Sequence, residues 1–155
     1  MIFSTKEDIE APIDQVFRMV SDFEALEKQA LRRGAEVRRT DKLASKGIGM
    51  CWQAGFRFRG KQRDVSIELT EFDVPNRLAA ASVSGGLQAN LVLDLVALSR
   101  RRTRMSLDME LTPTTLSSRL LVQSLKLARG KLNRRFHLRV AEYAKDLEDR
   151  FNRRA

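Results

Sequence analysis

The feature that most limits the fold of this chain is a series of segments in which apolar and polar residues alternate. The clearest is the segment 47–59. Its even positions carry apolar side chains, at Ile48, Met50, Trp52, Ala54, Phe56 and Phe58, and its odd positions include Gly49, Gln53, Arg57 and Arg59. This period of two is typical of a strand with one face in an apolar interior. Almost no titratable side chain shares the apolar faces, which favours binding over catalysis.

Further segments alternate in the same way, at 2–10, 35–41, 65–70, 78–84, 87–95 and 104–111. Turn signals separate several of them, namely Gly60-Lys61, Pro75-Asn76 and Gly85-Gly86. These short connections indicate hairpins, so we expect about seven strands in a mostly antiparallel sheet.

Helical spacing occurs in two other regions. Pro12 ends the first strand, and two short helices are expected after it, the second capped by Ser21-Asp22 and ending at Gly34. From about 115 to 150, apolar residues recur every three or four positions, at Leu121, Leu125, Ala128, Leu132, Phe136, Val140, Tyr143 and Leu147. This stripe predicts one long amphipathic helix. Gly130 within it is either a tolerated defect or a point of bending or close approach.

Length and residue counts exclude several classes of protein. A chain of 155 residues fits a single domain over 1–155. One cysteine, Cys51, excludes an intrachain disulfide, and one histidine, His137, limits both catalytic triads and histidine-based metal sites. No apolar run approaches the roughly 20 residues that span a bilayer, and no signal peptide is visible. We therefore expect a cytoplasmic protein.

The charge balance points to anionic partners. The chain has 29 basic and 20 acidic residues, a formal net charge of +9. Clustered Arg and Lys suit phosphate, in nucleic acid or in acidic lipid headgroups. A basic surface that only aids solubility is the alternative.

These elements form an α+β fold in which a curved antiparallel sheet wraps around the C-terminal helix, because that arrangement buries both apolar surfaces. Four parts of the sequence then resemble the START-like, helix-grip superfamily, also called SRPBCC (polyketide cyclase/dehydrase and lipid transport). They are residues 9–17, Ser21-Asp22-Phe23, Gly47-Ile48-Gly49 leading into Trp52, and Thr112-Pro113. The resemblance implies a hydrophobic cavity between sheet and helix for ligands such as sterols, phospholipids, quinones, plant hormones or polyketides. No metal or other cofactor is expected.

By this resemblance, thirteen residues would face the cavity: Met50, Trp52, Phe56, Ile67, Leu69, Leu91, Leu93, Met105, Leu107 and Met109 on strands, and Leu121, Leu125 and Leu132 on the helix. The alternative for each is that it only fills the core. The indole N–H of Trp52 has two possible partners, a ligand oxygen or a backbone carbonyl.

Catalytic residues are not assigned. Tyr143, Thr5, Glu7 and Glu71 are expected to face inward or to reach the cavity rim, yet no two of them form a recognisable acid/base pair. His137 is expected at the surface or its boundary. Cys51 has outward parity and no assignable basic partner.

Three functions remain open. The first is a carrier or sensor of an apolar small molecule, such as a lipid, a quinone or a polyketide-like compound. The second is a polyketide cyclase or aromatase-like enzyme, which needs at least two convergent polar groups in the cavity. The third is a polyanion-binding protein, with a packed core, for RNA, ribosomes or acidic membranes. Oligomeric state is left open.

Overall fold

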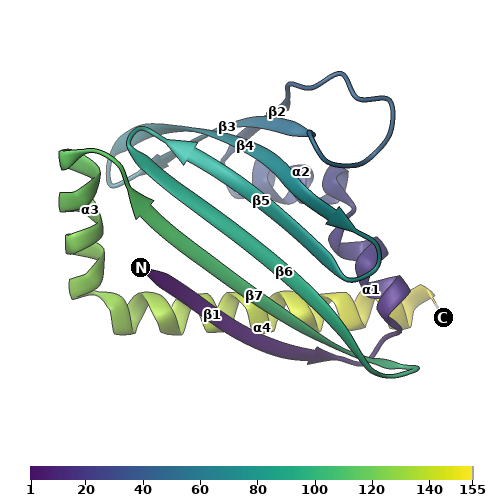
Figure 1. Cartoon of the computed structure of the whole chain (residues 1–155). Helices are drawn as coiled ribbons and strands as arrows, with labels where there is room; N and C mark the ends of the chain where they lie inside the picture. Colours follow the sequence, from purple (N-terminus) through teal and green to yellow (C-terminus); the bar gives the residue numbers. More distant parts are fainter. Residues whose placement is uncertain (155) are drawn as a thin grey trace.

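A computed structural model describes residues 1–154 and shows one seven-stranded antiparallel sheet with four helices (Figure 1). In chain order the elements are β1 (Ile2–Ile9), α1 (Ile13–Val20), α2 (Phe23–Arg32), β2 (Glu36–Arg39), β3 (Cys51–Phe58), β4 (Lys61–Asp73), β5 (Arg77–Ser84), β6 (Leu87–Ser99), β7 (Arg102–Pro113), α3 (Leu116–Leu127) and α4 (Arg129–Arg154). The predicted α+β, helix-grip class is confirmed.

The strand order explains how a cavity can form. The sheet runs β1-β7-β6-β5-β4-β3-β2, so β1 pairs with the last strand and the two short helices carry the chain to the opposite edge. Figure 1 shows the long helix α4 crossing one face of the sheet, with α2 on the same side. We call this face the concave face. Alternate residues of every strand point towards it.

One strand departs from the expected alternation. The pairing of β4 with β5 shifts between Leu69 and Glu71, so the extra residue reverses the parity beyond that point. Phe72 therefore packs inward, with its ring centroid 5.5 Å from that of Phe17. The expectation that Glu71 faces inward is wrong, because its carboxylate instead pairs with Arg77 at 2.6 Å on the outer face.

The predicted continuous helix over 115–150 is also wrong. The chain leaves helical geometry at Ala128, which has φ −102° and ψ 18°, and α3 and α4 then run in different directions (Figure 1). Each part has its own support: α3 packs against β7 and α4 packs against β1. Gly130 lies inside α4, two residues after the break.

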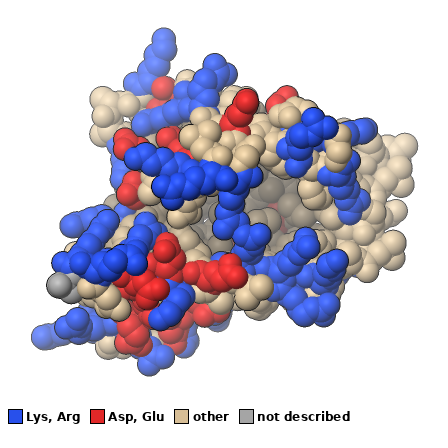
Figure 2. All heavy atoms as spheres, turned by 180° about the vertical axis from the view of Figure 1, so that it is seen from behind, with Lys and Arg blue, Asp and Glu red and all other residues tan. Residues whose placement is uncertain are grey.

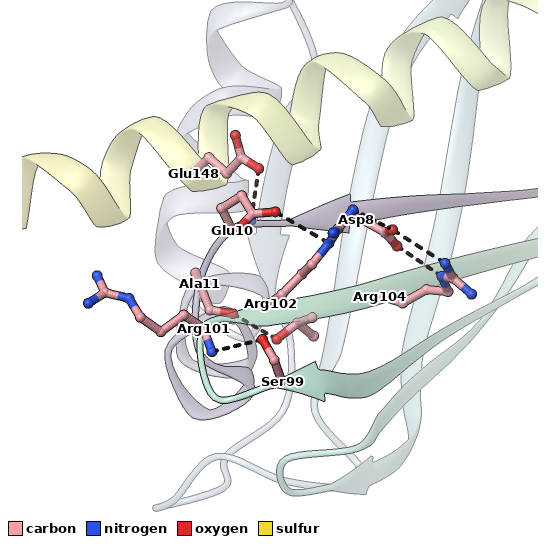
Figure 3. A network of polar contacts seen from close by, with 9 residues as sticks. Asp8, Glu10, Ala11, Ser99, Arg101, Arg102, Arg104 and Glu148 are labelled. Atoms are coloured by element: carbon pink, nitrogen blue, oxygen red, sulfur yellow. Dashed lines mark hydrogen bonds and ion pairs between the residues drawn. The ribbon is translucent and has the colours of Figure 1, made fainter.

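Polar contacts fix the C-terminal half of α4 against the first strand (Figure 3). The Glu148 carboxylate accepts a hydrogen bond from the backbone N–H of Glu10 at 2.8 Å. Beside it, Asp8 pairs with Arg104 at 2.9 Å and with Arg102 at 3.3 Å, and these contacts lower the pKa of its carboxyl. Beneath this network Ile9 and Leu147 are fully buried. The fixed half of α4 carries Tyr143, which faces the sheet.

Among residues 1–154, no helix is both long and apolar enough to cross a membrane.

Candidate ligand-binding site

A cavity of about 330 Å³ lies between the concave face of the sheet and helices α1, α2 and α4. We call it the sheet cavity. The lining residues are almost all apolar: Val20, Phe23, Leu26, Glu27, Ala30, Val37, Trp52, Ile67, Leu69, Leu78, Ala79, Ala80, Leu91, Leu93, Leu107 and Tyr143. Figure 2, which views the molecule from the helix side, shows a hollow with Lys and Arg side chains around much of its rim.

Strand register brings the apolar side chains of the wall together. Trp52 lies opposite Ile67, Leu69 lies opposite Ala80, and Ala80 lies opposite Leu91. Leu93 and Leu107 are likewise paired across β6 and β7. Six of the thirteen residues expected to face a cavity therefore line this one: Trp52, Ile67, Leu69, Leu91, Leu93 and Leu107.

The other seven lie elsewhere. Met50 and Met105 are buried in the core, and Phe56 and Met109 are half-buried on β3 and β7. Leu121 and Leu125 do not line the sheet cavity, because the break at Ala128 directs α3 away from it. Leu132 lies after the break, near the start of α4, and does not line it either. The helical wall comes instead from Val20 of α1, from α2 and from Tyr143 of α4.

The contribution of α2 was not predicted. Phe23, Leu26, Glu27 and Ala30 all line the cavity, and their spacing of three or four residues after the Asp22 cap is the signal that would have indicated it. None of the residues of α2, Phe23–Arg32, is fully buried. This helix therefore covers the cavity without being part of the closely packed core.

Comparisons with known proteins agree with this geometry. No protein-family model and no curated protein matches the sequence. Among solved structures, a protein from Thermus thermophilus superposes with a TM-score of 0.65 at 21% identity, over 97% of this chain and 96% of that one. A START superfamily protein from Mycobacterium smegmatis gives 0.57 at 12% identity, over 86% and 95% of the two chains. The Zhui aromatase/cyclase from a Streptomyces species gives 0.58 at 12% identity, over 74% and 69%.

This chain has the START-like, helix-grip fold. Both the open seven-stranded sheet and the long C-terminal helix follow that pattern. At these identities the likeness shows the fold, and the chemistry of the site has to be argued from the residues in it.

The indole of Trp52 has a side-chain partner in this helix-grip sheet. Its Nε1–H donates to Glu27 Oε1 at 2.7 Å, so neither of the two expected partners, a ligand oxygen or a backbone carbonyl, is used. The rings of Phe23 and Trp52 lie 5.3 Å apart, and the Lys46 ammonium lies 5.7 Å from the Phe23 ring. These contacts hold the start of α2 against β3.

Tyr143 is the second polar group of the cavity wall. Burial raises the pKa of its phenol to about 12, so the group stays protonated near neutral pH and can donate a hydrogen bond. Among the described lining residues, Glu27 and Tyr143 are the two that titrate. The cavity thus offers a carboxylate and a phenol in an otherwise apolar wall.

The remaining polar candidates lie outside this wall. Thr5 is buried and its Oγ1 is hydrogen-bonded to Nδ1 of the exposed His137 at 2.9 Å, while Glu7 lies farther along β1. The Cys51 thiol contacts the Gly49 carbonyl at 3.3 Å, and burial raises its pKa, so it lacks the features of a nucleophile. Residues 1–154 contain no cluster of three His, Cys, Asp or Glu side chains suited to a metal ion.

One basic side chain also belongs to the concave face. Arg63 pairs with Phe56, and its position along β4 puts it on the same face as Val65, Ile67 and Leu69. Its Nε is shielded from solvent and has no hydrogen-bond partner among residues 1–154. A shielded guanidinium nitrogen without a partner is unusual, because such groups are normally paired.

Proposed function

We propose that the protein binds an apolar small molecule in the sheet cavity. The observation that carries the proposal is the volume of about 330 Å³ inside a wall that is apolar apart from Glu27 and Tyr143 among the described residues that line it. Small-molecule sites in proteins span roughly 300–1,000 Å³ and are mostly apolar with a few polar groups. The structural likeness to a START superfamily protein and to an aromatase/cyclase supports the same class of function. A cytoplasmic location remains part of the proposal.

The ligand we favour is an amphiphile with an anionic end. Arg63 is four residues from Ile67, about 13 Å along the strand at roughly 3.3 Å per residue, and on the same face. A ligand with its apolar part against Ile67 would extend along β4 towards the guanidinium. A carboxylate or phosphate there would supply the partner that the Arg63 Nε lacks.

A fluorescence titration tests both parts of this proposal. Trp52 is the only tryptophan and lines the cavity, so its emission reports on occupancy without background. We expect oleic acid and methyl oleate to change the emission, and oleic acid to bind more tightly. Arg63→Met should abolish the difference between the two probes. Arg57→Met, at an exposed position of opposite parity on the neighbouring strand β3, should preserve it.

Two results would count against the proposal at different levels. No change in Trp52 emission with either probe, and no co-purifying small molecule, would contradict a ligand-binding cavity. Binding that Arg63→Met leaves unchanged would contradict only the anionic end.

An enzyme acting on a polyketide-like or aromatic ligand is the second candidate. The observation that favours it is that a carboxylate, Glu27, and a phenol, Tyr143, line the same cavity. Proton transfer to a bound ligand needs such groups within hydrogen-bond reach of it. If the protein is such an enzyme, Glu27→Gln or Tyr143→Phe should still bind the ligand but no longer convert it. If the protein is a carrier, the unmodified chain should not convert the ligand either.

A further inference from the structure

Helix α3 is apolar on two opposite faces. Val122 and Leu125 are buried against the rest of the protein, as an amphipathic helix requires. Leu116, Leu120 and Leu127 are nevertheless 75%, 59% and 92% exposed. At about 100° per residue these three leucines fall within about 40° of one another, on the side of the helix opposite Val122 and Leu125. We call them the α3 leucine face.

The α3 leucine face lies at one end of the molecule. Figure 1 shows α3 standing away from the long helix, and Figure 2 shows a broad surface without charged side chains at the corresponding end. The leucines contribute little to the fold, since most of their surface stays in water. Contiguous exposed apolar surface of this kind typically marks a site of interaction.

All charged residues on α3 and on the first half of α4 are basic. Residues 111–141 contain seven Arg or Lys residues and no Asp or Glu: Arg119, Lys126, Arg129, Lys131, Arg134, Arg135 and Arg139. The hairpin between β3 and β4 adds another cation, because Arg59 donates a hydrogen bond from Nη1 to Ser124 Oγ of α3 at 3.2 Å. Helix α3 and its neighbours therefore present an exposed apolar face with basic side chains beside it.

We propose that the α3 leucine face docks on an anionic lipid bilayer. The leucines would enter the boundary between headgroups and acyl chains, and Arg119, Lys126 and Arg129 would pair with lipid phosphates. The charge pattern favours this occupant over a second copy of the chain, because a two-fold contact through α3 would bring two basic borders together. Nucleic acid would match the charge but would leave the leucines in water. The proposal is independent of the sheet cavity.

Vesicle flotation of the full chain tests it. We expect the protein to float with vesicles of phosphatidylcholine mixed with phosphatidylglycerol, less so as salt increases, and not with phosphatidylcholine alone. The double variant Leu120→Gln/Leu127→Gln should bind at least about tenfold more weakly, since both side chains lose an apolar environment. Both leucines are exposed, so its circular dichroism and melting temperature should match those of the unmodified chain.

The control is Leu138→Gln on α4, where the leucine is 59% exposed, as Leu120 is. Unchanged flotation of this variant is expected. Equal losses in the control and the double variant would overturn the assignment to α3, as would equal binding to neutral and anionic vesicles or no binding at all. A dimer seen by light scattering and abolished by the double variant would assign the face to a second copy instead, and would also overturn the proposal.

Discussion

At the scale of single residues, the hydrogen bond between Trp52 and Glu27 joins the wall of the cavity to the helix that covers it. The indole N–H and the carboxylate meet at 2.7 Å, and the two side chains come from β3 and α2. A bond to a charged acceptor in a partly buried site is stronger than an average protein hydrogen bond. This contact orients the indole and, together with the packing of the Phe23 ring against Trp52, holds α2 against β3.

Replacing the indole should weaken the protein measurably. We expect Trp52→Phe to lower the free energy of unfolding by about 1–3 kcal/mol, because it removes the donor and leaves the Glu27 carboxylate without its partner. Urea denaturation followed by circular dichroism measures this change. Glu27→Gln keeps an acceptor and should cost less; an equal or larger cost would show that the carboxylate charge matters more than the bond.

Asp41 gives a prediction about pH. Its side chain is 7% exposed and accepts hydrogen bonds from Arg39 and from the backbone N–H groups of Leu43 and Cys51, so its pKa lies well below the usual value. The Arg39 hydrogen bond is the main cause. A carboxyl with a lowered folded-state pKa stabilises the fold above the unfolded-state value, about 3.9, and this contribution is lost as the pH falls from there towards the folded-state pKa.

The matching variant isolates that contribution. Asp41→Asn should be less stable than the unmodified protein at pH 7, and the gap between their melting temperatures should narrow as the pH falls below about 4. Thermal melts across this range check it. Parallel curves for the two proteins would show that Asp41 does not carry a pH-dependent contribution.

At the scale of elements, the strands were predictable and the helix break was not. Alternation located β3 to β7 because one face of each strand is buried and the other is not. The sequence pattern does not indicate the bulge after Leu69, because an extra residue reverses the parity without changing the composition of the strand. The pattern does not indicate the break at Ala128 either, because Leu125 and Leu132 continue the apolar spacing across it. The break becomes visible only in the packing, where α3 and α4 contact different strands.

Two glycines near α3 should respond in opposite directions to alanine. At Gly130, inside α4, an added Cβ would approach only the flexible end of Arg134, at 3.7 Å, so Gly130→Ala should stabilise the protein by up to about 1 kcal/mol. At Gly86 an added Cβ would lie 2.8 Å from Thr115 Cβ. Thr115 caps α3, so Gly86→Ala should destabilise by about 1–2 kcal/mol. Equilibrium unfolding separates the two, and equal signs would contradict this account of the α3 boundary.

The covering helix α2 should be the most readily opened wall of the cavity. None of Phe23–Arg32 is fully buried, whereas Val140, Ala144 and Leu147 of α4 are. Segments with few buried contacts open locally at low free-energy cost. Hydrogen exchange should therefore be faster in α2 than in 140–147, and a bound ligand should slow it in α2. Equal protection in both helices would contradict the prediction that α2 is the wall that opens most readily.

At the scale of the whole molecule, the sequence predicted apolar faces but not the space between them. Alternation placed Leu91, Leu93 and Leu107 on apolar faces, and only the family resemblance placed them in a cavity, because the same pattern is compatible with a packed core. Whether the space between sheet and helices is filled depends on the sizes of side chains from different elements, such as Ala80 of β5 and Ala30 of α2. The sequence pattern of one element does not show which residues of another element it faces. Both are small residues in the wall, and they help to leave the volume open.

The most direct test of the central claim, that the sheet cavity holds an apolar ligand, is native mass spectrometry of protein purified from cells. The unmodified chain should carry a small molecule that is released on denaturation. Ala80→Phe, which places a ring in the cavity, should lack it, while Ala81→Phe, the neighbouring position with opposite parity on β5, should retain it. A chain that carries no small molecule, or one that Ala80→Phe binds equally well, would contradict the claim.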